Sequence, residues 1–330
     1  MHRLLSAALL LCITCPASAT EDKRNSSGTR ILQAVPYAND DHPRHRLNLY
    51  VPEESAQPLP LVVFIHGGAW QSGNYHSGGG ILRPLVESGK YAGASIAYRL
   101  TDEAQWPAQI HDCKAAIRFL RSNAEKWNIN PDRIAVIGPS AGGHLASMMG
   151  TSSGVPSMKG EVGEHAETSD RVTCVVDLFG PSDLLQMDRQ APEGARLKHD
   201  APNSPESKLL GAPLQTIPER AQTANPITYI TPDDPPFLIL HGTSDAIVPF
   251  GQSVLLHDAL QSAGVSSVFI PLEGAGHGGP PFNRQQHRIR QFLDRHLHDM
   301  NVEEPHQNAP NDEKDTSGKP PKQPSGEGVN

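Results

Sequence analysis

The sequence predicts an α/β protein built on a mostly parallel central sheet, with helices covering both of its faces. Short apolar runs of strand length, such as 61–65 and 134–137, suit the interior of such a sheet. Helical patterns separate these runs along the chain, and this alternation is typical of a parallel sheet. A chain of 330 residues can bury a large core, while its 29 glycines and 30 prolines indicate long loops.

The first half of the chain alternates strands with helices after a polar segment, 20–30, that we expect to be irregular. Residues 45–51 alternate apolar and polar side chains, which predicts a half-buried strand. Further strands are predicted at 61–65 and 94–98, separated by a helix around 80–88. A helix that Pro107 opens runs through about Trp127, and its apolar face includes Ile110, Ala115, Ile117, Phe119 and Leu120.

In the second half, a strand at 134–137 leads into a helix at 144–149. The remaining elements are expected in the order strand 172–179, strand 236–240, helix 252–263, strand 268–270 and helix 282–297. Residues 151–170 are polar and show no period. The prolines and short helical pieces after residue 181 predict an insertion, 181–225, that forms a small cap over the functional site. We expect 151–225 to shape the substrate pocket.

The two ends of the chain differ in composition from its body. Arg3, the apolar run 4–14 and the Ala17-Ser18-Ala19 cleavage pattern predict a signal peptide at 1–19. That run is shorter than the roughly 20 residues of a membrane-spanning helix. We therefore expect export to the periplasm or outside the cell without stable membrane association; a retained N-terminal anchor is the alternative. Residues 20–300 are expected to form the folded domain, which carries every candidate site residue named below, followed by a polar, disordered tail at 301–330.

Charge and cysteine content exclude several classes of partner. The net charge of −8 argues against nucleic acid or an anionic membrane surface. Cys113 and Cys174, the cysteines that remain after residue 19, fall in a helix and a strand pattern, so we expect buried free thiols rather than a disulfide. Outside the predicted signal peptide, which holds Cys12-Ile-Thr-Cys15, the sequence contains neither C-x-x-C nor H-E-x-x-H, and no metal or cofactor is expected.

The turn Gly138-Pro-Ser-Ala-Gly142 stands between a predicted strand and a predicted helix and fits the pattern G-x-S-x-G. A serine at the tip of such a turn has a strained backbone and an exposed hydroxyl, and glycine is needed two positions to either side because larger side chains would clash. Ser140 is therefore the candidate nucleophile. The alternative is a tight turn without chemistry.

A serine hydroxyl needs a base and the base needs an orienting carboxylate. His277 lies in a turn of small residues after the last predicted strand, and Asp245 follows strand 236–240. Both then lie at the carboxyl edge of the sheet together with Ser140. A loop histidine and a turn-capping aspartate are the plain alternatives, and the weaker candidates for the carboxylate are Asp188, Asp233, Asp234 and Glu273. The order serine, aspartate, histidine is that of an α/β-hydrolase.

An oxyanion hole requires backbone N–H groups aimed at the developing negative charge. Ala141 follows the nucleophile and supplies one of them. Gly68 and Ala69, in the glycine-rich loop after strand 61–65, are the candidates for the other, and a plain glycine turn is the alternative. Trp70 either lines the substrate pocket or packs under this loop. No chemistry is assigned to His144.

The chain resembles the secreted α/β-hydrolases grouped with bifunctional feruloyl and acetylxylan esterases, near the hormone-sensitive-lipase-like esterases. The resemblance covers roughly 35–298 and rests on the motifs His66-Gly-Gly-Ala-Trp70, Asp112-Cys-Lys-Ala-Ala-Ile-Arg118, Gly138-Pro-Ser-Ala-Gly-Gly-His144, Phe179-Gly-Pro-Ser-Asp183, Ser204-Pro-Glu-Ser-Lys208 and Gly274-Ala-Gly-His-Gly278. By that resemblance Ser140, Asp245 and His277 match the family's triad.

The resemblance implies hydrolysis of acetyl or feruloyl esters of plant polysaccharide, or of small esters, through an acyl-enzyme. The form of the loop at 66–70 also occurs in arylformamidase-like amidohydrolases, so an amide substrate remains an alternative, and a prolyl peptidase is a weaker one. A degenerate binding module with this fold is the non-enzyme alternative. The expected partner is a small-molecule or carbohydrate ester.

Overall fold

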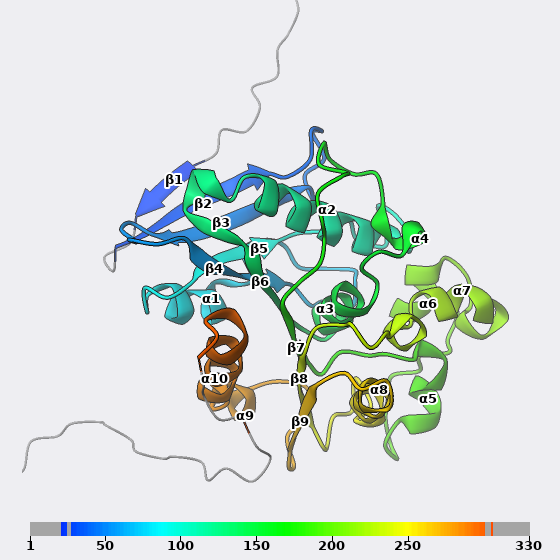
Figure 1. Cartoon of the computed structure of the whole chain (residues 1–330). Helices are drawn as coiled ribbons and strands as arrows, with labels where there is room; N and C mark the ends of the chain where they lie inside the picture. Colours follow the sequence, from blue (N-terminus) through cyan, green and yellow to red (C-terminus); the bar gives the residue numbers. More distant parts are fainter. Residues whose placement is uncertain (1–20, 25–27, 301–304, 306–330) are drawn as a thin grey trace, which may run out of the picture.

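The central feature of the computed structural model, which describes residues 21–24, 28–300 and 305, is one nine-stranded sheet in the order β1-β2-β3-β5-β4-β6-β7-β8-β9 (Figure 1). The strands are β1 (Glu21–Arg24), β2 (Thr29–Pro36), β3 (Arg46–Pro52), β4 (Leu59–Ile65), β5 (Ala92–Ile96), β6 (Ile129–Pro139), β7 (Cys174–Leu178), β8 (Phe237–Gly242) and β9 (Ser267–Leu272). The predicted fold class is confirmed.

The strands β5-β4-β6-β7-β8-β9 pair parallel with one another, and β1, β2 and β3 add antiparallel pairs at one end of the sheet, where β3 pairs antiparallel with β5. The side chains of β4, β5, β7 and β8 and of the second half of β6 are almost all buried, as the continuous apolar runs predicted. Parallel strands bring their carboxyl ends to one edge. The loops after β4, β6, β8 and β9, which carry the candidate site residues, therefore leave the sheet on the same side.

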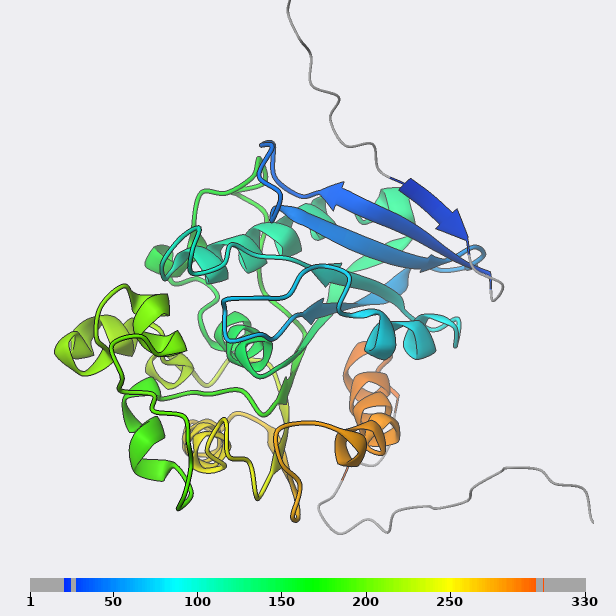
Figure 2. The same cartoon turned by 180° about the vertical axis from the view of Figure 1, so that it is seen from behind.

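Helices cover both faces of the sheet (Figures 1 and 2). They are α1 (Gly79–Val86), α2 (Ala108–Ser122), α3 (Ala141–Thr151), α4 (Pro156–Lys159), α5 (Met187–Gln190), α6 (Pro205–Leu210), α7 (Pro218–Thr223), α8 (Gly251–Ser262), α9 (Pro280–Asn283) and α10 (Gln286–Leu297). One apolar core includes side chains of α2, α3 and α8. A second core on the other face includes those of α1, α9 and α10.

Three expectations about the elements are corrected. The polar segment at 20–30 was expected to be irregular, yet Glu21–Arg24 forms an edge strand that pairs antiparallel with Thr29–Pro36. All four side chains of β1 are exposed, so it carries no apolar period. Helix α2 ends at Ser122, and a separate 3-10 turn covers Glu125–Trp127. The closing helix is two helices, α9 and α10.

The region predicted to form a cap contains the short helices α5, α6 and α7, which lie together beyond α3 and α8 (Figure 1). Cys113 and Cys174 are free and buried, as expected. Within the described ranges, no helix combines the length and the apolar character needed to cross a bilayer. The predicted signal peptide at 1–19 and the tail predicted at 301–330, Pro305 apart, fall outside the described residues.

Candidate active site

Ser140 occupies a sharp turn between strand β6 and helix α3. Its φ of 55° and ψ of −124° lie outside the regions that non-glycine residues normally adopt. The turn is fixed from both sides, because the Ser140 N–H donates to the Leu178 carbonyl oxygen at 2.8 Å and its own carbonyl accepts from the His144 N–H at 3.0 Å. A strained serine held at the start of a helix is the geometry expected of a nucleophile elbow.

The glycines on either side of Ser140 are required by close backbone contacts. A Cβ atom at Gly138 would lie 2.4 Å from the carbonyl oxygen of Gly142. A Cβ atom at Gly142 would lie 2.1 Å from the carbonyl oxygen of Ile65, at the end of β4. Both distances are shorter than any real contact, so the steric reason inferred from the sequence holds.

The structure brings His277 and Asp245 together. Nδ1 of His277 lies 2.7 Å from Oδ2 of Asp245. The other carboxylate oxygen, Oδ1, accepts from the backbone N–H groups of Ile247 at 2.8 Å and Val248 at 3.0 Å. The carboxylate is 2% exposed, while His277 is only half-buried. A fixed, buried carboxylate therefore orients an imidazole that substrate can reach.

The charge state of Asp245 decides the tautomer of His277. Burial alone raises the pKa of Asp245, but hydrogen bonds from His241 and His277 and the Ile247 N–H outweigh it and hold that pKa well below its usual range. An ionised carboxylate can only accept hydrogen bonds. Nδ1 of His277 must then carry the proton, and Nε2 of the neutral ring is free to accept one from a serine hydroxyl.

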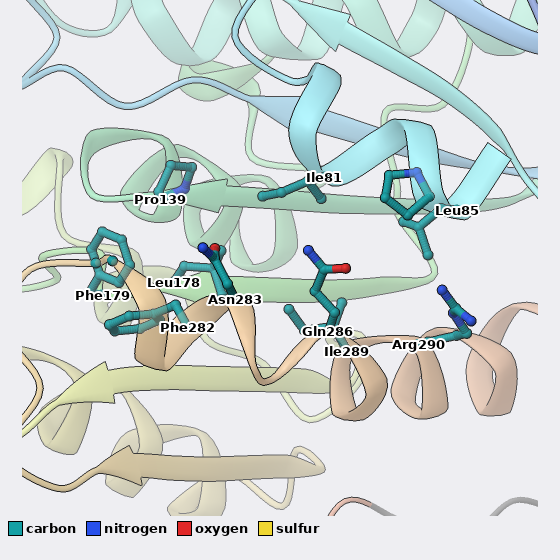
Figure 3. Close-up of a pocket in the computed structure, with 13 residues that line it drawn as sticks. Ile81, Leu85, Pro139, Leu178, Phe179, Phe282, Asn283, Gln286, Ile289 and Arg290 are labelled. Atoms are coloured by element: carbon teal, nitrogen blue, oxygen red, sulfur yellow. The ribbon is translucent and has the colours of Figure 1, made fainter. Parts of the chain in front are cut away.

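Phe179 connects the serine turn with the histidine loop. It follows Leu178, the residue bonded to the Ser140 N–H, and its ring lies edge-on to His277 with 4.6 Å between ring centroids. A cavity of about 170 Å³ is lined by Pro139, Phe179 and Gly278, among others (Figure 3). The chain neighbours of both Ser140 and His277 thus share one cavity wall.

The candidate oxyanion loop passes over the serine turn. A Cβ atom at Gly67 would lie 3.5 Å from Ser140 Cβ. Gly68 and Ala69 have φ values of 106° and 54°, so the loop is tightly turned here. Within the described part of the chain, no hydrogen bond of the N–H groups of Gly68, Ala69 and Ala141 to a protein acceptor is found. These three groups therefore remain available to an oxyanion.

Residues after β5 hold the oxyanion loop in place. The hydroxyl of Tyr98 donates to the carbonyl oxygen of His66 at 2.9 Å, and the two rings stack with centroids 4.1 Å apart. The Thr101 N–H donates to the carbonyl oxygen of Trp70 at 3.0 Å. Burial lowers the pKa of His66 to about 4, so this ring packs in the neutral form. The loop is thus fastened at both of its ends.

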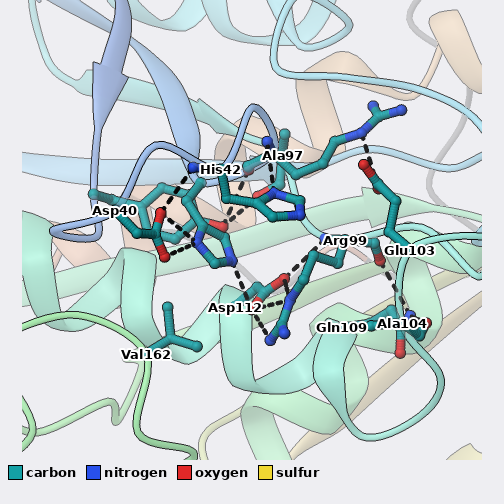
Figure 4. A network of polar contacts seen from close by, with 12 residues as sticks. Asp40, His42, Ala97, Arg99, Glu103, Ala104, Gln109, Asp112 and Val162 are labelled. Atoms are coloured by element: carbon teal, nitrogen blue, oxygen red, sulfur yellow. Dashed lines mark hydrogen bonds and ion pairs between the residues drawn. The ribbon is translucent and has the colours of Figure 1, made fainter. Parts of the chain in front are cut away.

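A buried ionic network fixes Arg99, between those two supports (Figure 4). Asp112 of helix α2 accepts from the Arg99 N–H at 2.8 Å and from Arg99 Nη2 at 2.6 Å. Nε2 of His45 lies 3.2 Å from Asp112 Oδ1, and its Nδ1 lies 2.7 Å from Asp40. Burial by itself raises the pKa of Asp112, but His45 and Arg99 outweigh it and lower that pKa. The network therefore anchors the segment that supports the oxyanion loop to α2.

Of the two alternatives for Trp70, the structure favours packing under the loop. Its side chain is 2% exposed and lies edge-on to the His144 ring, with 5.3 Å between centroids. Nε2 of His144 donates to the carbonyl oxygen of Ala224 at 2.7 Å. Burial lowers the pKa of His144 to about 4, so this histidine joins α3 to the end of the cap segment as a neutral ring.

The weaker candidates for the carboxylate lie elsewhere. Asp188 accepts from the N–H groups of His199 and Asp200. Asp233 and Asp234 accept from the hydroxyl of Thr231 in a turn. Glu273 is exposed. Sequence reasoning missed Tyr98 beside the oxyanion loop and two contributors beside the triad. His241 lies 3.3 Å from Asp245, four residues before it, and Phe179 packs on His277 with a φ of 49°. Phe179 begins one of the motifs on which the family resemblance rests, and His241 precedes Asp245 by four residues, but neither pattern indicated these contacts.

Within the described ranges, no three His, Cys, Asp or Glu side chains are grouped so that they could hold a metal ion.

The sequence profile of the BD-FAE family matches residues 47–260. The chain belongs to the BD-FAE family.

Relatives of this BD-FAE chain include named esterases. Esterase LipC of Mycobacterium tuberculosis is 35% identical over 224 residues, covering 67% of this chain and 53% of LipC. A probable isoprenylcysteine α-carbonyl methylesterase, ICMEL1 of Arabidopsis thaliana, is 30% identical over 239 residues, covering 72% of this chain and 49% of that protein. The chain therefore spans about half the length of the curated relatives it matches.

Solved structures support the assignment to the BD-FAE family and to the α/β-hydrolase fold. A truncated carbohydrate esterase from gut microbiota is 32% identical with a TM-score of 0.76, and the match covers 84% of this chain and 100% of that one. A bifunctional GH43-CE protein of Bacteroides eggerthii is 33% identical with a TM-score of 0.75, covering 83% of this chain and 36% of that one.

Proposed function

We propose that this BD-FAE chain is a serine carboxylic ester hydrolase that works through an acyl-enzyme. The observation that carries the proposal is the hydrogen bond between His277 and Asp245, in a loop that flanks the same cavity as the strained Ser140 turn. The similarity to LipC and to a gut-microbiota carbohydrate esterase supports ester chemistry.

In the proposed reaction, His277 Nε2 takes the proton of the Ser140 hydroxyl as its oxygen attacks the ester carbonyl carbon. The N–H groups of Gly68, Ala69 and Ala141 stabilise the negative oxygen of the tetrahedral intermediate. The bond to the alcohol then breaks and the alcohol takes the proton from His277. Water, activated by the same histidine, attacks the acyl-enzyme and releases the acid. Asp245 stays ionised throughout.

The proposed substrates are acetyl or feruloyl esters of plant polysaccharide, or small carboxylic esters. The carbohydrate esterase from gut microbiota and the GH43-CE protein support a carbohydrate ester, since each matches more than four fifths of this chain. A panel of acetyl, longer acyl and feruloyl esters on the purified protein decides among these substrates.

Hydrolysis of 4-nitrophenyl acetate by the wild type and by Ser140→Ala tests the reaction itself. Loss of the nucleophile should lower kcat by at least about a thousandfold. Equal rates would refute the proposal. An N-formyl aromatic amide, assayed with the same pair, separates an esterase from an amidohydrolase, because the latter would hydrolyse the amide at a rate comparable to the ester.

A further inference from the structure

The cavity lined by Pro139 and Gly278, the chain neighbours of Ser140 and His277, extends along the sheet. One end lies at Pro139 and Phe179, at the carboxyl ends of β6 and β7 (Figure 3). The other end lies at Leu85 of α1 and Arg290 of α10. The cavity therefore leads from the candidate catalytic edge into the space between two helices that cover one face of the sheet.

The lining of this cavity is mainly apolar. Leu85, Leu178, Phe282 and Ile289 are each at least nine-tenths buried, and Ile81 of α1 is half-buried between them. Polar side chains that line it, Asn283, Gln286 and Arg290, are exposed. An apolar interior with a polar rim excludes a bare sugar ring as the preferred occupant and suits a hydrocarbon group.

The size of the cavity limits the occupant to about one ring. Its volume is about 170 Å³. An apolar protein cavity of about 150 Å³ is known to bind benzene. A single aromatic ring or an alkyl chain of similar volume thus fits, whereas the methyl group of an acetyl ester leaves most of the space empty.

We propose that the cavity between α1 and α10 is a specificity subsite for one ring-sized apolar group of the ester substrate, bounded by Ile81, Leu85, Phe282 and Ile289. This inference rests on the proposed function, because it places the reacting ester at Ser140. The group that enters belongs either to the acid or to the alcohol of the ester. An apolar group from either side of the ester would make the same contacts, and esters that carry the ring on the acid or on the alcohol separate the two cases.

Three esters and two variants test this subsite. Ethyl acetate lacks a ring, ethyl phenylacetate carries a benzyl group on its acid, and benzyl acetate carries it on its alcohol. Ile81→Trp fills the cavity from α1. Arg83→Trp, on the same helix but exposed and outside the cavity lining, is the matched control. Acid release is followed at constant pH, and each variant is compared with the wild type on the same ester, which cancels differences in intrinsic reactivity.

The subsite predicts that Ile81→Trp lowers kcat/KM at least tenfold for one of the two benzyl esters and changes it less than about twofold for ethyl acetate. The affected ester shows whether acid or alcohol occupies the cavity. Arg83→Trp should match the wild type on all three. An equal change for all three esters, or no change for any, overturns the proposal. Retained hydrolysis of ethyl acetate also shows that the variant is folded.

A wild type that hydrolyses none of the three esters would count against the proposed function, and the subsite would still be tested by binding. Saturation-transfer NMR with benzyl alcohol should then detect binding to the wild type and to Arg83→Trp but not to Ile81→Trp. Equal signals from the wild type and Ile81→Trp, or none from the wild type, would overturn the subsite.

Discussion

His277 and Asp245 are joined by a 2.7 Å hydrogen bond between Nδ1 and Oδ2, although they follow two different strands, β9 and β8. The same carboxylate group accepts backbone N–H groups through its other oxygen. This leaves the carboxylate with little freedom to rotate. The imidazole is consequently held in one tautomer and one orientation before substrate arrives, and the predictions about catalysis follow from that preorganisation.

Asp245→Asn should lower kcat by roughly a thousandfold or more, because the amide can donate to Nδ1 and stabilise the wrong tautomer of His277. Steady-state kinetics with 4-nitrophenyl acetate measure the effect. Glu273→Gln is the control, since Glu273 precedes the same histidine loop and is exposed. Comparable kinetics of the two variants would show that Asp245 has no role in orienting the base.

Gly142→Ala should destabilise the fold and abolish activity, because the new Cβ atom would lie 2.1 Å from the Ile65 carbonyl oxygen and force the serine turn away from β4. Gly80→Ala is the matched control: Gly80 lies in helix α1 and its Cβ would meet nothing within 4 Å. That change should be neutral or stabilise by up to about 1 kcal/mol. Thermal unfolding and activity are measured together, and a fully active Gly142→Ala would refute the close contact.

Tyr98→Phe should lower kcat about three- to tenfold with little change in KM, because it removes the hydroxyl that fixes the His66 carbonyl at the base of the oxyanion loop. Tyr37→Phe removes a hydroxyl that donates to the Ala97 carbonyl at 2.8 Å and lies 3.3 Å from the Arg44 carbonyl, and neither acceptor belongs to that loop. Both variants should lose about 1 kcal/mol of stability. If kcat falls equally in both, the effect is one of general stability and not of loop position.

The buried carboxyl of Asp177 should make the free energy of unfolding depend on pH. Burial raises its pKa to about 6, against partial compensation by the Gly180 N–H and the Ser147 hydroxyl. This carboxyl ionises near pH 4 in the unfolded chain but near pH 6 in the folded protein. The folded protein therefore loses stability as the pH rises between these values. Asp177→Asn keeps an acceptor for Gly180 and should gain roughly 2–3 kcal/mol relative to the wild type between pH 4 and 7.5.

Urea unfolding of Asp177→Asn and of the wild type at pH 4 and at pH 7.5 provides the comparison. The difference between the two proteins isolates Asp177, because every other carboxylate, including Asp245, titrates in both. A difference that stays constant with pH, or that favours the wild type at pH 7.5, contradicts the assignment.

The buried strands and the placement of the candidate triad could be predicted from the sequence because strong local signals specify them. The apolar run 61–65 is of the kind that forms a buried strand, and Gly138 and Gly142 permit the close backbone contacts of the turn around Ser140. Strand β1 could not be predicted, because its charged side chains are all exposed and it is defined by pairing with β2. No change in the apolar pattern marks the break between α9 and α10, so this break could not be predicted either.

The parts of the site that escaped prediction depend on contacts between distant segments. Phe179 packs on His277, and Tyr98 supports His66, through side chains whose partners no local pattern indicates. The pocket was expected to depend on residues 151–225. The cavity beside Ser140 does take Leu178 and Phe179 from that region, but most of its lining comes from α1, α9 and α10.

The most direct test of the central claim is to react the protein with a fluorophosphonate probe and locate the adduct by peptide mass spectrometry. An activated serine attacks such a probe, whereas an ordinary serine does not. The account predicts one adduct, on Ser140, that is absent from Ser140→Ala and strongly reduced in Asp245→Asn. A wild-type protein that remains unlabelled, or an adduct on another serine, would contradict it.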